Sequence, residues 1–217
     1  DFCKNTYLFS KKNIVKIPLL SAVRFPTPEN KNFAGVSNNF VWIGGGGAVH
    51  KGLDLVLECF REMPEYKLTV CGPVAKEKDF VKLYQKELYQ TQNISYVGRI
   101  NIKGEKFKNI IENSIGLIYP SASEGQSGSV ITALHAGLIP IITYESGVDV
   151  KSFGIELERP SVEEIQKAVK KISMLNTKDL KTCSVAAWKY ANENHTIENF
   201  RRSYTSFIDS IFNEAYL

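Results

Sequence analysis

The sequence predicts an α/β fold in which a doubly wound parallel sheet is followed by a helical C-terminal tail. Two observations lead to this fold class. Short apolar runs rich in β-branched residues alternate with longer segments of helical period, which is typical of parallel sheets covered by helices. Beyond Pro160 only segments of helical period remain, and they predict the tail.

Five short strands are expected. Each is a run of four or five mostly apolar residues that ends close to a glycine, proline or polar turn. The expected strands are Phe40–Ile43, Lys67–Cys71, Ile94–Val97, Ile115–Tyr119 and Ile139–Thr143. Because a helical segment follows each of the first four, we expect parallel pairing through right-handed crossovers.

The segments between the strands carry apolar residues at helical spacing on one face. The expected helices are Gly52–Arg61, Lys76–Gln90, Lys106–Asn113 and Gly128–Ala136, followed in the tail by Val162–Ile172, Lys178–Asn192 and Ile197–Phe212. Aromatic residues recur near helical spacing in the last two, at Trp188, Tyr190, Phe200, Tyr204, Phe207 and Phe212. They predict first a stripe that faces the core and second a surface for a further domain.

The domain organisation follows from where this alternation begins. Residues 1–37 are less regular and carry three prolines, so they predict an entry strand at Ile14–Leu19 and a linker from a preceding domain. Residues 38–217 then form one domain with its C-terminal helices, a size that can bury its own core. Because the chain begins without an initiator Met, we expect it to be a piece of a longer protein.

Composition and charge exclude several classes of protein. Of the 217 residues, 43% are hydrophobic and 23% charged, which is typical of a packed globular chain and not of a disordered one. The 27 basic and 23 acidic residues leave a net charge of +4, which is too small for a nucleic-acid-binding surface. We therefore expect no nucleic-acid partner, although the excess leaves room for a local anion site.

The predicted location is the cytoplasm. The N-terminus shows no signal segment, and no run approaches the roughly 18 apolar residues of a membrane span. The cysteines, at positions 3, 59, 71 and 183, show no C-x-x-C pairing and fit a reducing compartment. The lysines of residues 103–108 predict first a solvated helix face and second a minor attraction to acidic lipids, so membrane contact is expected to be at most peripheral, at the inner face.

The first candidate site is the glycine-rich loop of residues 44–52, which follows the first expected strand. Glycines let a ligand approach the backbone, the following helix begins with unpaired N–H groups, and Lys51 adds a positive charge. The loop therefore suits an anion such as a diphosphate. Val49 breaks the dinucleotide-binding fingerprint, and Gly52 after Lys51 breaks the P-loop pattern. A flexible turn without a ligand is the alternative.

The second candidate site is the loop of residues 119–129, between the fourth strand and its helix. It carries the carboxylate of Glu124 and several hydroxyls, which can bind sugar hydroxyls, and a helix start that can bind a phosphate. The alternative is that Ser127 or Ser129 only caps the helix and Glu124 is solvated. Ligands of open α/β sheets bind at the carboxyl ends of the strands, so we expect both loops at one edge.

Taken in order, these residues resemble a known family. The motifs are the glycine loop with Lys51-Gly52, Cys71-Gly72-Pro73, Tyr96-Val97-Gly98-Arg99, Pro120-Ser121-x-x-Glu124-Gly125, and Ala133-Leu134-His135-Ala136-Gly137-Leu138-Ile139-Pro140. Over residues 38–212 the chain resembles the donor-binding C-terminal domain of group 1 retaining glycosyltransferases. The resemblance implies the Rossmann-like half of a GT-B fold.

The resemblance also implies a site for a nucleotide sugar of the UDP or GDP type, without a metal or other cofactor. Lys51 and Glu124 would be catalytic: Lys51 neutralises the leaving diphosphate, and Glu124 holds hydroxyls of the donor sugar. The other implied donor-binding positions surround the diphosphate, the base and the sugar. They are Gly44, Gly45, Gly46, Gly47, His50, Gly72, Arg99, Ser127, Gly128, Ser129 and Thr132. Consistently, the sequence has no Asp-x-Asp and only scattered histidines.

Three departures from the family pattern concern the donor and acceptor sites. The second of two glutamates separated by seven residues would fall at Thr132, and an arginine often found near Gly45 or Gly46 is absent. The acceptor-binding N-terminal domain is also missing. A neutral hydrogen bond from Thr132 is worth about half a charge-assisted one, so we expect weaker nucleotide affinity.

The leading hypothesis is the donor-binding half of a retaining glycosyltransferase of polysaccharide biosynthesis. It would move a hexose to a glycan or lipid-linked acceptor and be inactive without its N-terminal domain. The competing hypothesis is a non-catalytic nucleotide- or partner-binding module with a degenerate donor site, for which Thr132 and the missing arginine argue. A nicotinamide-dependent oxidoreductase is disfavoured by the failed fingerprint.

Overall fold

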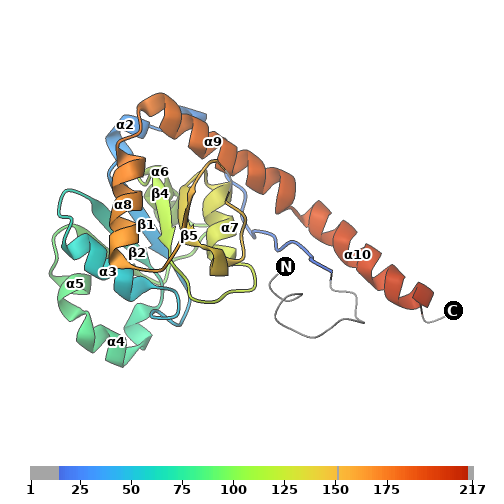
Figure 1. Ribbon diagram of the computed structural model, residues 1–217, viewed down its shortest axis with the longest axis horizontal. Coiled ribbons are helices and arrows are strands. Elements are labelled where there is room, and N and C mark those ends of the chain that lie inside the picture. Colours follow the sequence, from blue (N-terminus) through green and yellow to red (C-terminus); the bar gives the residue numbers. More distant parts are fainter. Residues whose placement is uncertain (1–14, 151, 215–217) are drawn as a thin grey trace.

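A six-stranded parallel sheet forms the centre of the molecule (Figure 1). The structure is a computed structural model that describes residues 15–150 and 152–214. The strands are β1 Asn39–Ile43, β2 Lys67–Cys71, β3 Ile94–Gly98, β4 Gly116–Tyr119, β5 Ile139–Thr143 and β6 Ile155–Leu157. Their order is β3-β2-β1-β4-β5-β6 with every pair parallel, which confirms the predicted doubly wound fold.

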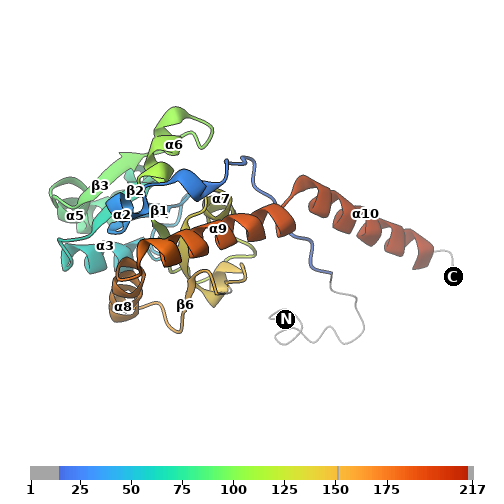
Figure 2. The ribbon, with the colours of Figure 1, turned by 90° about the horizontal axis from the view of Figure 1, so that it is seen from above.

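Helices cover the sheet and form the tail. They are η1 Pro28–Asn30, α2 Phe33–Val36, α3 Leu53–Arg61, η2 Val74–Lys76, α4 Lys78–Leu83, α5 Gln85–Tyr89, α6 Glu105–Glu112, α7 Gly128–His135, η3 Tyr144–Ser146, α8 Val162–Ser173, α9 Thr177–Asn194 and α10 Ile197–Glu214. α3 packs against α8, and α7 packs against α9, while α6 lies on the opposite side of the sheet from α3 (Figure 2).

The core lies against both faces of the central strands. Every residue of β4 and β5 is buried, as are four of the five residues of β1. Strands buried on both faces appear in a sequence as nearly continuous apolar runs, which is why these three were recognisable. Trp42, Tyr119 and Phe40 are the largest fully buried side chains of the described residues.

The helix expected at Lys76–Gln90 is interrupted. Tyr84 separates α4 from α5 with φ −107° and ψ 26°, outside the helical region. Its hydroxyl donates to Glu58 Oε1 at 2.7 Å, and its ring stacks on that of Phe80 at a centroid distance of 4.7 Å. Phe80 and Leu88 are buried on either side of the break, so the apolar period continues through it and periodicity alone predicts one helix.

The expected entry strand is wrong where the structure describes it. Residues 15–19 form no strand, and Ile14 lies outside the described residues. The segment instead crosses the start of α7: the N–H of Leu19 donates to Gln126 Oε1 at 2.6 Å, and the carbonyl oxygen of Leu19 lies 2.7 Å from His195 Nδ1. These side chains satisfy backbone groups that a sheet edge would otherwise bind.

The following residues pack on the domain. Phe33 and Val36 are buried in the core, and both η1 and α2 contact α9. Residues 28–36 are therefore part of the packed structure and not an extended linker. That they follow a preceding domain stays a prediction. The short α2 and the three-residue β6 carry too little apolar pattern to be predicted.

The tail divides into a packed helix and a protruding one. α9 lies along the domain, where the indole of Trp188 donates to the carbonyl oxygen of Phe25 at 2.9 Å. α10 extends away from the sheet (Figure 1), and Tyr204 and Phe212 are 49% and 60% exposed. The predicted core-facing aromatic stripe is therefore wrong for α10. None of the described helices is long and apolar enough to cross a membrane.

Candidate functional site

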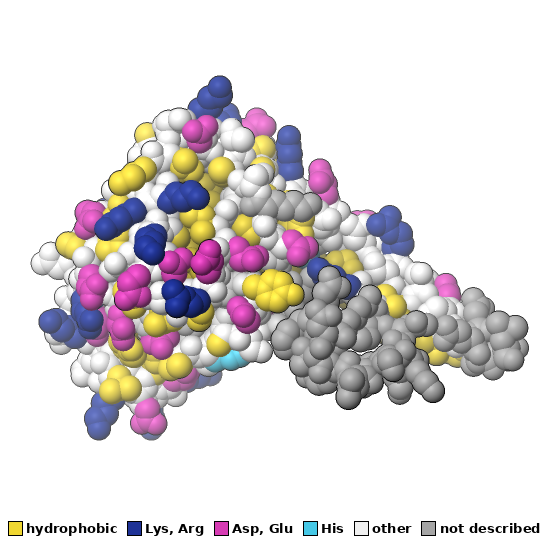
Figure 3. All heavy atoms as spheres, in the orientation of Figure 1, with side chains coloured by type: hydrophobic (Ala, Val, Ile, Leu, Met, Phe, Trp, Pro, Cys, Tyr) yellow, Lys and Arg dark blue, Asp and Glu magenta, His cyan; other side chains and the backbone are white. Residues whose placement is uncertain are grey.

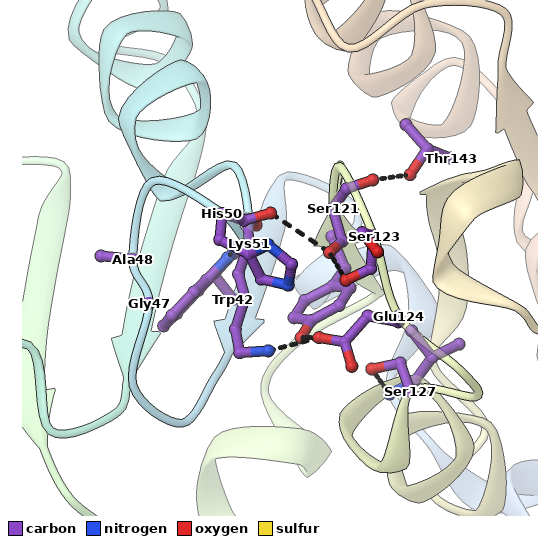
Figure 4. Close-up of polar contacts among 12 residues, drawn as sticks. Trp42, Gly47, Ala48, His50, Lys51, Ser121, Ser123, Glu124, Ser127 and Thr143 are labelled. Carbon is purple, nitrogen blue, oxygen red and sulfur yellow. Dashed lines mark hydrogen bonds and ion pairs between the residues drawn. The ribbon is translucent and has the colours of Figure 1, made fainter.

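Two loops meet at the carboxyl ends of β1 and β4. These strands are neighbours, and the sheet runs to β2 and β3 on one side and to β5 and β6 on the other. The chain therefore reverses its direction of winding between them, which is where open α/β sheets bind their ligands. Figure 4 shows the loop after β1 facing the loop after β4.

The centre of this site is an ion pair between Lys51 and Glu124. Lys51 Nζ donates to Glu124 Oε1, and the two side chains are only 14% and 18% exposed. The hydroxyl of Tyr119, the last residue of β4, donates to the same oxygen at 2.8 Å. The ammonium group also lies 5.9 Å from the centre of the Tyr119 ring. The structure thus brings together the two residues predicted as catalytic, and adds Tyr119.

Mutual contact keeps this pair charged. Burial lowers the pKa of Lys51, but the hydrogen bond with Glu124 and the proximity of Tyr119 outweigh burial, so the pKa lies above its usual range. Burial raises the pKa of Glu124, but Lys51 and Tyr119 outweigh it and the pKa lies below its usual range. Burial raises the pKa of Tyr119, so its phenol stays protonated and serves as a donor at neutral pH.

Unused hydrogen-bonding capacity remains on both partners. An ammonium group has three donors, and one of those on Lys51 goes to Glu124. Both bonds to Glu124 reach Oε1, and no hydrogen bond from the described residues reaches Oε2. The pair therefore presents cationic donors and an anionic acceptor at one point of the sheet edge.

The glycine loop has one closely packed end and one open part. The N–H of Gly44 donates to the carbonyl oxygen of Cys71 at 2.9 Å, and a Cβ on Gly72 would lie 2.6 Å from the oxygen of Gly44. Gly72 therefore lets β1 and β2 end close together. Gly45 and Gly46 are exposed, and a Cβ on either would meet no atom within 4 Å. They leave room for a ligand.

The end of the glycine loop is fixed against the neighbouring loop. Gly52 has φ +67° and caps α3, and a Cβ there would lie 2.4 Å from the oxygen of Pro120, so only glycine fits. The indole of Trp42 donates to the carbonyl oxygen of Lys51 at 3.2 Å, and its ring stacks on Tyr119 at 6.3 Å. Lys51 is thus held through its backbone as well as its side chain.

The predicted residue His50 contributes its backbone. The carbonyl oxygen of His50 accepts from the N–H of Ala122 at 2.9 Å and from Ser121 Oγ at 3.2 Å, which ties the two loops together (Figure 4). The His50 side chain is exposed. Among the described residues no group of three His, Cys, Asp or Glu side chains gathers in a way that could hold a metal ion.

The loop after β4 is supported by the turn that follows β5. The N–H of Glu124 donates to the oxygen of Glu145, and that of Ser127 donates to the oxygen of Ser146, both at 2.9 Å. Ser127 also caps α7, because its hydroxyl accepts from the N–H of Val130. Its buried side chain therefore has the structural role weighed from the sequence. Gly128 is exposed beside it in the first turn of α7.

Two predicted donor-binding residues do not join the Lys51 and Glu124 pair. Thr132 is only 7% exposed, and its hydroxyl donates to the oxygen of Gly128 at 2.8 Å and lies 3.3 Å from Ser21 Oγ. Arg99 is exposed after β3, and no hydrogen bond or ion pair in the described part of the chain engages it. Ser129 is half-buried in α7.

The sequence assigned no role in the site to three residues that shape it. Trp42 and Tyr119 were predicted as strand residues, and each also has a polar group that bonds to the site. Glu77 lies beyond β2, and its carboxylate binds the glycine loop at Gly47 and Ala48. No local sequence signal marks a contact between a side chain and backbone groups 30 residues away.

A family model described as "Glycosyl transferases group 1" matches residues 28–187, about three quarters of the chain. This chain belongs to the group 1 glycosyltransferases. The finding confirms the resemblance seen in the motifs, all of which lie within the matched range. No curated protein matches the chain in a search by sequence.

Solved glycosyltransferase structures share the fold of this family member at low sequence identity. Sucrose-phosphate synthase (tll1590) from Thermosynechococcus elongatus has a TM-score of 0.75 at 13% identity, over 98% of this chain and 56% of that one. Anabaena Alr3699/HepE in complex with UDP and glucose has a TM-score of 0.69 at 12% identity, over 82% of this chain and 49% of that one. TarM from S. aureus, in a complex that contains UDP, has a TM-score of 0.63 at 14% identity, over 90% of this chain and 38% of that one. The chain spans about half the length of the first two.

Proposed function

We propose that this chain is the donor-binding half of a retaining glycosyltransferase that uses a nucleotide sugar of the UDP or GDP type. The observation that supports the proposal is the half-buried Lys51 and Glu124 pair at the switch point between β1 and β4. A cation and a carboxylate at one point suit a ligand with a diphosphate next to a polyol. A nucleotide sugar has this chemistry.

Each partner of the pair has a separate task in the proposed reaction. The two remaining donors of Lys51 bind diphosphate oxygens and stabilise the negative charge that develops as the glycosidic bond to the diphosphate breaks. Oε2 of Glu124 accepts from a hydroxyl of the donor sugar. Tyr119 keeps its proton and orients the carboxylate by donating to Oε1. This electrostatic mechanism requires no cofactor.

The surrounding positions define the rest of the proposed donor site. Backbone N–H groups at Gly45 and Gly46 and at the start of α7, around Gly128 and Ser129, face the phosphates. Arg99 lies on the loop after β3 and flanks the base. Two of the similar structures, Anabaena Alr3699/HepE and TarM, are complexes that contain UDP, which supports a uridine nucleotide as the first ligand to test.

The whole protein is proposed to transfer a hexose to a glycan or lipid-linked acceptor in the cytoplasm or at the inner face of the membrane. An N-terminal domain would hold the acceptor, consistent with a chain that spans about half of similar structures. Alone, the 217 residues should bind donor weakly and transfer nothing. The weak affinity follows from Thr132, whose hydroxyl is already bound within the domain.

Calorimetry with UDP, GDP and their glucose conjugates tests the donor site. We expect one of the two nucleotides to bind, and Lys51→Ala and Glu124→Ala to weaken binding of the nucleotide sugar by at least about tenfold each, as expected for a lost charge-assisted bond. Glu65→Gln, at an exposed position before β2, is the matched control. Absence of binding by all four ligands, or unchanged affinity in both alanine variants, would overturn the proposal.

A second candidate function is a non-catalytic module with a degenerate donor site. The observation in its favour is Thr132, which is buried against Gly128 and Ser21 instead of reaching the ion pair. The two candidates differ in the longer protein: transfer or donor hydrolysis by a chain extended upstream rejects the module. Nucleotide binding without turnover in that longer chain rejects the enzyme.

A further inference from the structure

The carboxylate of Glu77 is bound to the middle of the glycine loop. Its Oε1 accepts from the N–H of Gly47 at 2.9 Å, and its two oxygens accept from the N–H of Ala48 at 3.0 and 3.2 Å. Glu77 is half-buried and lies just beyond η2, on the side of β1 that faces β2 and away from β4. The protein thus supplies its own anion to two amides that a glycine-rich loop otherwise offers to a phosphate.

This contact limits where a phosphate can bind. The amide of Gly44 is engaged by Cys71, and those of Gly47 and Ala48 by Glu77. Within the described part of the chain, no hydrogen bond engages the amides of Gly45 and Gly46. A phosphate at Gly47 would have to break charge-assisted hydrogen bonds and lie beside a second negative charge.

The same contact is linked to Lys51 through the backbone. The carbonyl oxygen of Gly47 accepts from the N–H of Lys51 at 3.0 Å, and that of Ala48 accepts from the N–H of Leu53 at 2.9 Å. Gly47 therefore lies between the Glu77 carboxylate on one side and the Lys51 amide on the other. The Ala48 side chain is fully buried and anchors this turn to the core.

Order in this loop has to come from such contacts. Glycine has the largest backbone freedom of any residue, and four follow one another from Gly44 to Gly47. A ligand that orders a mobile loop loses affinity by the entropy of ordering, whereas a loop ordered in advance does not. Glu77 is placed to order the loop before the donor arrives.

We propose that Glu77 is a positioning residue for the donor diphosphate. Its carboxylate fixes the turn from Gly47 to Lys51 and repels phosphate from Gly47, so that the diphosphate lies between Lys51 and the free amides of Gly45 and Gly46. The inference rests on the proposed donor-binding function. It differs from a competing role in which the carboxylate occupies the phosphate site and is displaced.

Binding measurements on the 217-residue chain separate these roles. We expect Glu77→Ala to weaken UDP or GDP binding by about tenfold and Glu77→Gln to weaken it less, because the amide oxygen can still accept one hydrogen bond. Binding of the nucleoside without phosphate should not change, and Glu65→Gln is the matched control. Tighter binding in Glu77→Ala would show competition, and equal binding would show no role; either overturns the inference.

A double-mutant cycle tests whether Glu77 acts through Lys51. If it does, the double variant Lys51→Ala with Glu77→Ala binds the nucleoside diphosphate no more weakly than Lys51→Ala alone, whereas additive losses of affinity contradict the link. Hydrogen exchange supplies a readout without ligand: peptides covering residues 44–52 should exchange faster in Glu77→Gln than in Glu65→Gln. Unchanged exchange would refute the ordering of the loop.

Failure of the proposed function has a different signature. If the unaltered chain binds neither nucleotide nor nucleotide sugar, the donor site itself is wrong, and the role of Glu77 falls with it. If the unaltered chain binds and the Glu77 variants bind equally well, only the role of Glu77 is wrong.

Discussion

The two loops of the site lie at the same sheet edge but are held in different ways. The loop after β1 is a run of glycines fixed by side chains that lie outside it, Trp42 on β1 and Glu77 beyond β2. The loop after β4 is fixed by backbone groups of the turn after β5, through Glu145 and Ser146. The first loop therefore depends on the identity of side chains outside it, and the second on the close approach of two backbones. Their tolerance to substitution should differ accordingly.

The largest effect is expected where the second loop meets its supporting turn. Gly147 has φ +70°, and a Cβ there would lie 2.1 Å from the oxygen of Gly125. Gly147→Ala should lower the free energy of unfolding by about 3 kcal/mol, from backbone strain and displacement of a backbone that cannot yield. Urea unfolding followed by circular dichroism measures this loss.

Gly125→Ala is the matched control for that loop. A Cβ on Gly125 meets no atom within 4 Å, and the residue is exposed. Its free energy of unfolding should change by less than about 0.5 kcal/mol. Equal losses in the two variants would contradict the claim that backbone contact supports this loop.

A smaller loss is expected where the two loops meet. Gly52→Ala places a Cβ 2.4 Å from the oxygen of Pro120 at φ +67° and should cost about 2 kcal/mol. It should also weaken nucleotide binding, because Lys51 moves with the turn. Gly45→Ala, in the open part of the loop, should leave thermal stability unchanged. A stable Gly52→Ala variant with full affinity would disprove this packing.

Removal of a single hydrogen bond between the loops should have a milder effect. Ser121 Oγ donates to the oxygen of His50 at 3.2 Å, and the Ser121 side chain is fully buried. Ser121→Ala should reduce the free energy of unfolding by about 1 kcal/mol. Ser123→Ala, at an exposed position, serves as the control in the same denaturation series. An equal loss of unfolding free energy in that variant would contradict a contribution from the bond between Ser121 and His50.

The contribution of the Lys51 and Glu124 ion pair to stability depends on pH. Because the pKa of Glu124 is below its unfolded value, its contribution to stability is present above the unfolded pKa and is lost as pH falls through the folded pKa. The pKa of Lys51 is raised, so its contribution is present below the unfolded pKa and is lost as pH rises through the folded pKa. The pair is thus intact across neutral pH.

An NMR titration of the Glu124 carboxyl tests the direction of its pKa shift. In Lys51→Met the opposing charge is lost while burial remains, so the carboxyl pKa should rise above that of the unaltered chain. The same titration of the unaltered chain gives the reference. A Glu124 pKa that does not move would mean that the two charges are not coupled in solution.

Sequence pattern was sufficient for five of the six strands of the sheet and for the pair at its edge. β2 and β5 have the predicted bounds, because each is a short, mostly apolar run that ends at a turn. Lys51 and Glu124 lie in the loops that follow β1 and β4, so their proximity is expected from the strand order of a doubly wound sheet. The strands are recognised from local sequence patterns, and the ion pair from the positions of its residues in loops together with the rule that ligands bind where the strand order reverses.

The remaining features depend on contacts that a linear pattern does not contain. The bond from Glu77 to Gly47 joins a side chain to a backbone group, and every residue type except proline would offer that N–H at position 47. The burial of Thr132 against Ser21 depends on the path of an irregular segment. The protrusion of α10 is invisible to periodicity, because an apolar stripe has the same period whatever covers it.

Trp42 gives the molecule an internal optical reporter. Its indole bonds to the backbone of Lys51 and stacks on Tyr119, whereas the second tryptophan of the chain, Trp188, lies on α9 against Phe25. Fluorescence from the two side chains therefore originates in different surroundings. Substitution of Trp188 by phenylalanine would leave one emitter beneath the ion pair, so that ligand arrival and loop ordering could be followed in real time without an added label.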